Sequence, residues 1–363
     1  MAALILIASL IGLIAGSTLV PTPEEVRASF KQAQKFYGQE DYKQAIENYE
    51  RINSVESNLL VAEEITEEIG DIEAPIKEIA LYQTGNSYFK QAEEAQIKSF
   101  RTRQPERKAA LEEEAKAGFR KSASYFRRSE ETATSPKLKA LARNRLVSVL
   151  YESGDYEEVI REGKAFEELY PDNRWLVNVL YNAGWAYFDT EQYEESIEAF
   201  QKLVRHFPAG YQAERALFQI GEAYFNQGKF EEAAPWYQDV VDRQRIDQMS
   251  ERELLRMRRE KIAGLVDETA LELAAKAQIK VGDCYAKSGN SENAVEAYKK
   301  VINAIAQEQR LVSEGYIRLA DMYYDSGDYE GAVRTYHVAI DGSNNRYFQA
   351  SMQSLLAEHY YKT

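Results

Sequence analysis

Residues 207–241 read FPAGYQAERALFQIGEAYFNQGKFEEAAPWYQDVV, and the spacing of their apolar residues indicates how the chain folds. It contains five spaced positions: Gly221, Tyr224, Phe230, Ala233 and Tyr237. Steps of three and four residues place side chains on one face of a helix. The six-residue step from Tyr224 to Phe230 contains Gly228, which is typical of a helix end. The stretch therefore predicts two short antiparallel helices that pack through aromatic rings.

The same five-position pattern recurs along the chain. Close copies are Gly184, Tyr187, Tyr193, Ser196 and Phe200, and Ala320, Tyr323, Tyr329, Ala332 and Tyr336. Weaker copies are Ala33, Phe36, Tyr42, Ala45 and Tyr49; Gly282, Tyr285, Ser291, Ala294 and Tyr298; and Val147, Leu150, Tyr156, Val159 and Gly163. Gly85 and Tyr88 match the first two positions of the pattern and indicate the first helix of one more pair. A repeat held in register over this length predicts a solenoid of stacked helix pairs.

The pattern resembles the tetratricopeptide repeat over about residues 23–345. This resemblance implies an all-α fold, a right-handed superhelical solenoid of antiparallel helix pairs with about seven repeats. Residues 207–241 are closest in style to repeats of bacterial cell-envelope proteins, namely the outer-membrane assembly lipoprotein and the Tol–Pal coordinator. The resemblance implies a non-enzymatic scaffold that binds a partner protein or peptide in a concave groove.

Three steps between repeats are longer than the basic 37 or 38 residues, and they predict insertions near 53–74, 92–118 and 243–268. The first insertion contains an acidic, helix-like stretch, and the second lengthens the helices of the second repeat. Residues 346–363 begin RYFQASMQSLLAEHYY, which predicts a helix that caps the exposed core of the last repeat.

The repeats are preceded by an apolar segment, residues 2–20, which carries no charged residue. As a helix it would span about 28 Å, close to the hydrocarbon thickness of a bilayer. The small residues 15–17 are typical of a signal-peptide cleavage zone, and Ser17 replaces the Cys that a lipoprotein needs. We expect residues 1–22 to be a signal peptide or membrane anchor, with the repeats in the periplasm, free or anchored to the inner membrane. Because bases follow the segment and none precedes it, the alternative is the cytoplasmic face of the membrane.

Composition and motifs limit the chemistry of the chain. A net charge of −14 argues against a nucleic-acid partner, and the single Cys284 excludes an internal disulfide and a Cys-rich zinc site. The sequence contains no phosphate-binding glycine loop, no nucleophile elbow and no His-Glu-x-x-His. We therefore expect no catalytic residues, no metal, no cofactor and no small-molecule substrate. The competing function is an accessory factor of an envelope or peptidoglycan enzyme, or a cytoplasmic membrane-anchored scaffold.

A helical wheel predicts the binding groove. On the first helix of each predicted pair, an arc of amides and aromatic residues lies away from the aromatic residue at the second position of the pattern. The resemblance places these first helices on the concave surface. The predicted groove residues are Asn86, Phe89, Asn144, Tyr151, Asn178, Tyr181, Asn182, Trp185, Phe188, Gln219, Phe225 and Tyr324. The alternative is that these aromatic residues only pack neighbouring first helices together.

Two insertions are rich in bases although the chain as a whole is acidic. The candidate basic patch consists of Arg101, Arg103, Arg107, Arg256, Arg258 and Arg259. Such a patch would suit an acidic partner or anionic lipid. The alternative is that these side chains lie on solvated helix faces and pair with neighbouring acids.

Overall fold

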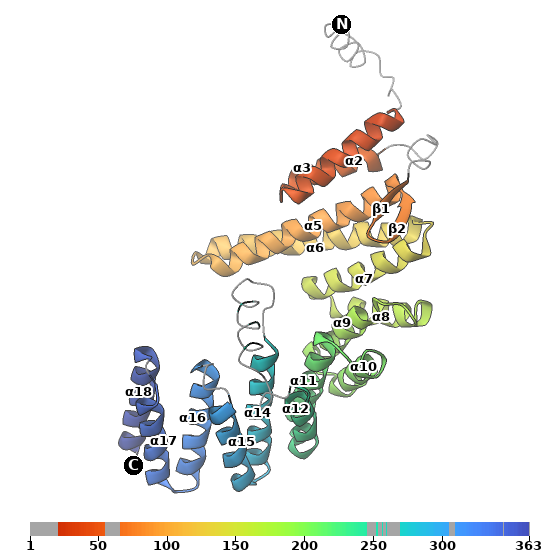
Figure 1. The fold of residues 1–363 in the computed structure, drawn as a ribbon. Helices are drawn as coiled ribbons and strands as arrows, with labels where there is room; N and C mark the ends of the chain where they lie inside the picture. The colour runs from red at the N-terminus through yellow and green to blue at the C-terminus, as the bar shows by residue number, and fades with distance from the viewer. Residues whose placement is uncertain are drawn as a thin grey trace. The chain divides into compact units, whose positions relative to one another are not determined.

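The computed structural model describes most of the chain. The described residues are 21–54, 66–244, 269–304, 309–343 and 345–362, together with the helical positions Arg252, Arg256 and Arg259. They form helices joined by turns, with one two-stranded hairpin (Figure 1). Two compact units result, Met1–Ala186 and Tyr187–Thr363, and their boundary falls within one helix. The predicted apolar segment lies outside the described residues, and the superhelical course of the whole array stays a prediction.

The first unit is built from antiparallel helix pairs. Its elements are α2 (Pro23–Gly38), α3 (Tyr42–Asn53), β1 (Thr66–Ile69), β2 (Ile72–Pro75), α5 (Ile76–Arg101), α6 (Pro105–Thr132), α7 (Pro136–Ser153), α8 (Tyr156–Leu169) and the first part of α9 (Leu176–Asp189). Thr22 caps α2 and accepts a hydrogen bond from the backbone N–H of Glu25, whose side chain binds the N–H of Thr22 in return.

The second unit continues the same alternation. Its elements are the end of α9, α10 (Tyr193–His206), α11 (Tyr211–Asn226), α12 (Phe230–Gln244), α14 (Ala270–Lys287), α15 (Ser291–Ala304), α16 (Gln309–Asp325), α17 (Tyr329–Asp341) and α18 (Arg346–Lys362). The helix α18 packs its Phe348, Met352 and Leu356 against a buried cluster on α16 and α17 that includes Tyr336. Among the described residues, no helix combines the length and apolar character needed to cross a bilayer.

The turn between the two helices of a repeat has one recurring geometry. After α11, Gly228 adopts a left-handed conformation with φ of 73°, and the N–H of Lys229 donates to the carbonyl of Tyr224 at 3.0 Å. The same backbone hydrogen bond occurs in six repeats. In each, the acceptor is the second residue of the five-position pattern (Tyr224 in this repeat) and the donor lies five residues later. The donors are Asp41, Asp155, Gln192, Lys229, Asn290 and Asp328. This bond satisfies a carbonyl that the helix end would leave unpaired.

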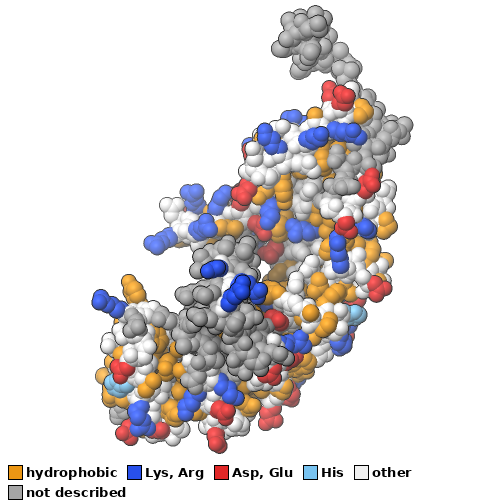
Figure 2. Space-filling model, in the orientation of Figure 1, with side chains coloured by type: hydrophobic (Ala, Val, Ile, Leu, Met, Phe, Trp, Pro, Cys, Tyr) orange, Lys and Arg blue, Asp and Glu red, His pale blue; other side chains and the backbone are white. Residues whose placement is uncertain are grey.

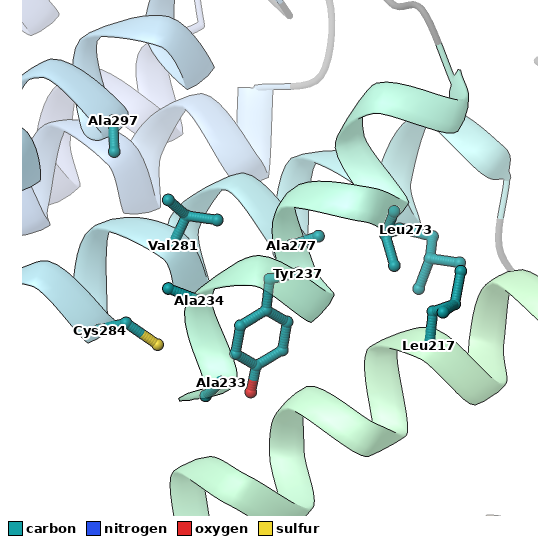
Figure 3. Close-up of a cluster of buried hydrophobic side chains, with 10 residues drawn as sticks. Leu217, Ala233, Ala234, Tyr237, Leu273, Ala277, Val281, Cys284 and Ala297 are labelled. Atoms are coloured by element: carbon teal, nitrogen blue, oxygen red, sulfur yellow. The ribbon is translucent and has the colours of Figure 1, made fainter. Parts of the chain in front are cut away.

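The small residue of each pattern makes room for an aromatic ring of the second helix. A Cβ atom added at Gly221 would lie only 2.7 Å from Cε1 of Tyr237, which is fully buried. Figure 3 shows the Tyr237 ring within a buried cluster that also contains Leu217, Ala277 and Cys284. The five-position pattern therefore describes close packing of the two helices around one ring.

The first insertion differs from its predicted helix-like form over residues 66–75, which form an antiparallel hairpin. Ile69 pairs with Ile72 across a two-residue turn, and Gly70 takes the left-handed conformation that such a turn needs, with φ of 63°. Ile72 is buried while Glu73 is exposed, so β2 alternates as a half-buried strand. The remaining part of that insertion, residues 55–65, lies outside the described residues.

The second insertion occupies the outer parts of α5 and α6. These helices have 26 and 28 residues and lie side by side along their length (Figure 1). They approach closely because Gly118 faces Ala92: a Cβ atom at Gly118 would lie 2.9 Å from the Cβ of Ala92. Of the third insertion, 243–268, the structure describes the end of α12 and three exposed arginines.

Candidate functional site

The first helices of the second unit carry a repeated pair of polar side chains around the small residue. Relative to that residue, one polar side chain lies two positions before and an acid lies one position after. The pairs are Gln219 and Glu222 on α11, Lys280 and Asp283 on α14, and Arg318 and Asp321 on α16. A spacing of three residues places both members of a pair on one face of their helix.

The first two acids, Glu222 and Asp283, each bind the tyrosine of their own second helix and the base of the next first helix. Tyr237 donates its hydroxyl to Glu222 at 2.6 Å, and Lys280 Nζ lies 2.8 Å from the same carboxylate. Glu222 therefore connects α11 to α12 and α14. Because Tyr237 is buried and Glu222 and Lys280 are only partly exposed, the fold fixes the positions of the three groups relative to one another.

The connection is repeated one helix pair further along. Tyr298 donates its hydroxyl to Asp283 at 2.8 Å, and Arg318 Nε lies 3.5 Å from Asp283. Burial raises the pKa of Asp283, and the Arg318 guanidinium and the Tyr298 hydroxyl oppose that rise. At the last repeat, His359 of α18 lies 3.1 Å from the Tyr336 hydroxyl and 3.8 Å from Asp321.

Of these side chains, Lys280, Asp283, Tyr298, Arg318 and Asp321 line a cavity of about 780 Å³ beside α11, α14 and α16. Its lining residues are Phe218, Phe225, Lys276, Ile279, Lys280, Asp283, Ala286, Lys287, Ser291, Tyr298, Glu314, Arg318, Asp321, Met322, Asp325 and Ser326. The volume is within the range of ligand sites, about 300–1,000 Å³. The lining contains four acids and four bases together with apolar side chains, so the cavity suits a ligand that carries both charges.

The predicted groove residues of the second unit are divided between the cavity and the turns. Phe225 lines the cavity, where Lys280 Nζ lies 4.6 Å from the centre of its ring. Tyr324 contacts Tyr329 and His359 instead, with ring centres 5.0 and 4.7 Å away. Gln219 and Phe188 are half-buried outside the lining of this cavity.

The predicted groove residues of the first unit are more deeply placed. Asn86, Phe89 and Asn144 are buried; Asn86 donates to the Gln83 side chain, and the Arg145 guanidinium lies 4.7 Å from the centre of the Phe89 ring. Half-buried positions are Tyr151, Asn178, Tyr181, Asn182 and Trp185. Asn182 donates to the Ser148 hydroxyl at 3.2 Å, which ties α9 to α7, and Tyr181 packs edge-on against Trp185.

In five repeats, the aromatic residue that directly follows Phe36, Leu150, Tyr187, Tyr224 or Tyr323 has a regular partner. It packs on the ring five residues later, at the start of its own second helix, with ring centres 5.0–5.6 Å apart. The pairs are Tyr37–Tyr42, Tyr151–Tyr156, Phe188–Tyr193, Phe225–Phe230 and Tyr324–Tyr329. These aromatic residues therefore join the two helices of one repeat at the turn, a contact that neither the groove prediction nor its alternative included.

The candidate basic patch is distributed over the two units. Arg101, Arg103 and Arg107 are exposed at the α5–α6 end of the first unit. Arg256 and Arg259 are exposed in helical conformation, and Arg258 lies outside the described residues. The structure therefore gives a described cluster only for the three arginines at the end of α5 and α6.

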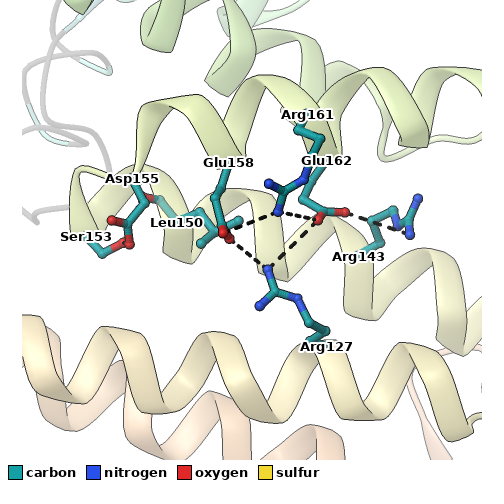
Figure 4. A network of polar contacts seen from close by, with 8 residues as sticks. All are labelled: Arg127, Arg143, Leu150, Ser153, Asp155, Glu158, Arg161 and Glu162. Carbon is teal, nitrogen blue, oxygen red and sulfur yellow. Dashed lines mark hydrogen bonds and ion pairs between the residues drawn. The ribbon is translucent and has the colours of Figure 1, made fainter.

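The first unit contains a different charged network between α6, α7 and α8, shown in Figure 4. Arg127 Nη2 lies 2.7 Å from Glu158, Arg143 Nη2 lies 3.8 Å from Glu162, and Arg161 bridges both acids. Arg143 also pairs with Glu130 at 2.6 Å. Because the charges are matched within the network, it serves the packing of these helices more readily than ligand capture.

The described residues offer little reactive chemistry. Among them, no group of three or more His, Cys, Asp or Glu side chains is arranged to hold a metal ion. Cys284 is buried, and burial raises its pKa to about 12, so the thiol stays protonated at neutral pH.

The polar cavity residues that sequence reasoning missed include Lys280, Asp283, Arg318 and Asp321. They occupy the same helix positions as Asn182 and Trp185, which the helical wheel did select, because the small residues Gly184, Gly282 and Ala320 mark equivalent registers. A wheel drawn for all repeats, with charged residues included, would have found them.

Comparisons with known proteins agree with this repeat architecture. Tetratricopeptide-repeat family models match residues 181–247, 275–307 and 316–346. The crystal structure of the apo form of RapI has 12% identity, covers 92% of this chain and 82% of its own, and has a TM-score of 0.53, which shows the fold alone.

Other solved structures are less alike in shape. A tetratricopeptide repeat protein from Parabacteroides merdae has 13% identity, 74% and 87% coverage and a TM-score of 0.42. YrrB, described as a TPR protein with an unusual peptide-binding site, has 16% identity, 64% and 99% coverage and a TM-score of 0.40. No curated protein sequence matches the chain. Residues 181–247, 275–307 and 316–346 of this chain therefore resemble tetratricopeptide repeats in sequence.

Proposed function

We propose that this chain is a non-enzymatic scaffold that binds a peptide segment of a partner protein in the cavity of α11, α14 and α16. The observation that carries the proposal is that neighbouring first helices contribute equivalent positions to one cavity: Phe225 and Ala286 on α11 and α14, and Lys280 and Arg318 on α14 and α16. A site built from repeated positions suits a ligand with a repeated backbone, which a peptide has. Tetratricopeptide repeats are in general protein-interaction modules, which supports the same function.

The cavity chemistry defines the class of peptide. Phe225, Ile279 and Met322 supply apolar contacts, while Lys280, Asp283 and Arg318 are already engaged within the protein. Lys287 and Asp325 are exposed lining residues, and no ion pair among the described residues involves either one. The preferred peptide therefore carries an apolar side chain together with an acid for Lys287 and a base for Asp325.

A selection from a random peptide library against the full chain tests this proposal. The affinity of an enriched peptide is measured by fluorescence anisotropy for the wild type and for Lys287→Glu and Asp325→Lys. Matched controls are Lys299→Glu on α15 and Asp341→Lys on α17, both exposed and outside the cavity lining.

The cavity variants should weaken binding by at least about tenfold each, since a charge reversal at a contact costs about 1.4 kcal/mol or more. The control variants should change affinity by less than about twofold, because their charges lie outside the cavity. Equal effects in both sets, or no enriched peptide, would contradict the proposal.

We propose in addition that the scaffold acts in the bacterial cell envelope, with its repeats in the periplasm. Support comes from the uncharged run 2–20, which contains the small residues 15–17 near its end. Alkaline phosphatase fused after Thr363 should be active in whole cells. An inactive fusion that stays with the membrane would select the cytoplasmic-face alternative, and an inactive soluble fusion would contradict both locations.

A further inference from the structure

The helices α5 and α6 extend well beyond the length of a repeat. They have 26 and 28 residues, while the longest other described helices, α7 and α14, have 18. The difference of 8 to 10 residues corresponds to about 12–15 Å of helix. Residues 103–110, which include part of the connection between α5 and α6 and the first turn of α6, are all exposed. The pair therefore ends in a narrow free end within the first unit (Figure 1).

This free end, defined as residues 97–108, exposes apolar side chains. Phe100 is 75% exposed and Ile97 is 47% exposed. Ile97, Phe100 and Arg101 are spaced by three and four residues, so they lie on one face of α5. The exposed phenylalanine and the exposed isoleucine therefore form a small apolar surface at the end of α5.

The free end is also basic, against the charge of the chain as a whole. Residues 97–108 contain five bases and one acid, while the full chain carries −14. Lys98 and Lys108 pair with neighbouring glutamates. Among the ion pairs of the described residues, none involves Arg101, Arg103 or Arg107. Figure 2 shows Lys and Arg side chains gathered around this end of α5 and α6.

We propose that the free end of α5 and α6 binds an anionic lipid surface. Phe100 and Ile97 enter the headgroup region, and Arg101, Arg103 and Arg107 bind lipid phosphates and carboxylates around them. Apolar side chains surrounded by Arg and Lys are the composition of segments that bind at the interface of anionic membranes. The free end is the part of this acidic chain that such a surface attracts.

The shape of the free end favours a lipid surface over an acidic protein. A stable protein interface buries about 800 Å² per partner and needs a complementary surface. The free end offers about one turn from each helix, and no cavity described in the structure is lined by residues 97–108. A bilayer adapts to the inserted side chains, so it needs no matched concave surface. The inference concerns a second site and does not depend on the peptide cavity.

The test places a reporter on the inserted residue of the full chain. Phe100→Cys is labelled with the environment-sensitive fluorophore NBD, in a chain whose buried native thiol is removed by Cys284→Ala. Vesicles of phosphatidylcholine with 30% phosphatidylserine are compared with vesicles of phosphatidylcholine alone. Because residues 2–20 can hold the chain on either vesicle, the NBD signal reports the free end itself. A control label replaces Tyr347, an aromatic residue on α18 that is 90% exposed.

We expect the emission of the label at position 100 to shift to the blue and rise on the anionic vesicles only. Each base near such a surface contributes about a fivefold factor. Arg101→Gln, Arg103→Gln and Arg107→Gln together should therefore reduce the inserted fraction, expressed as an equilibrium constant, by about 100-fold. Salt at 1 M should also remove the signal, since the screening length falls to about 3 Å. The label at position 347 should respond equally to both vesicles.

The matched control variant combines Lys299→Gln, Lys300→Gln and Arg334→Gln, which removes the same charge from exposed positions on α15 and α17. It should leave the signal at position 100 within about twofold of the unchanged chain, because charges elsewhere do not touch the inserted lipid. Unchanged far-ultraviolet circular dichroism verifies that every variant is folded. The proposal is overturned if the label responds equally to both vesicles, if both triple variants act alike, or if an acidic protein alone produces the response.

Discussion

The turn at Glu191 provides a direct test of the repeat geometry. Glu191 has φ of 60°, while Gly228 has φ of 73° at the same turn position of the next repeat. A residue with a Cβ atom pays about 1–2 kcal/mol for this conformation. Replacing Glu191 by glycine removes that cost but adds about 0.5–1 kcal/mol of backbone entropy to the unfolded chain. Glu191→Gly should therefore raise the free energy of unfolding by about 0.5–1 kcal/mol.

The matched control is the reverse exchange, Gly228→Glu. A Cβ atom at Gly228 would meet no atom within 4 Å, so this substitution introduces backbone strain without a clash. It should lower the free energy of unfolding by a similar amount. Urea denaturation followed by circular dichroism measures both variants, and their m-values should equal that of the wild type. For a unit of 150–250 residues, 1 kcal/mol corresponds to a change in Tm of about 2–4 °C.

A loss of stability in both variants, at unchanged m-values, would refute this reasoning. It would mean that the exposed Glu191 side chain contributes more than the left-handed backbone costs. A gain for Glu191→Gly with no loss for Gly228→Glu would also contradict it, because the two turns would then not be equivalent.

Two further predictions concern buried polar groups. The hydroxyl of Tyr49 is buried without a hydrogen-bond partner among the described residues, so Tyr49→Phe should leave the free energy of unfolding unchanged or raise it by about 1 kcal/mol. Tyr237→Phe should instead lower it by about 1.5 kcal/mol, because Tyr237 donates to Glu222. Equal urea midpoints for the two variants would show that the Tyr49 hydroxyl is bonded. Because burial raises the pKa of Asp283, the stability that its protonated form contributes is complete below about pH 4 and is lost as pH rises through the folded-state value. Relative to wild type, Asp283→Asn should therefore gain stability between pH 4 and pH 7 in parallel denaturation curves, and a progressive loss over that range would show that Arg318 lowers the pKa instead.

The repeat register was readable from the sequence because it depends on local spacing. The position of Gly221 relative to Tyr237 is fixed by a close contact between adjacent helices, so only small residues fit there. The hairpin at 66–75 was not predicted, because its strands are short and acidic. The signal that could have revealed it is Ile69-Gly70-Asp71-Ile72, a glycine-containing two-residue turn between β-branched residues.

The helical wheel and the cavity overlap in one predicted groove residue, Phe225. Other lining side chains, such as Lys280 and Asp283, lie at helix positions equivalent to Asn182 and Trp185. The helical wheel favoured aromatic residues, however, and their main partners are rings five residues later. The charges that matter pair between different repeats, such as Glu222 with Lys280 across 58 positions. Such pairing depends on how repeats stack, which local periodicity does not encode.

The pairing between repeats also determines what the cavity can select. Glu222 with Lys280, and Asp283 with Arg318, neutralise one another within the wall and hold α11, α14 and α16 at fixed spacing. A ligand therefore meets a preorganised site, which lowers the ordering cost of binding. Because these wall charges are already engaged, discrimination between peptides falls to Lys287, Asp325 and the apolar floor. Substitutions in the paired wall should mainly change stability, and substitutions at Lys287 and Asp325 should mainly change which peptide binds.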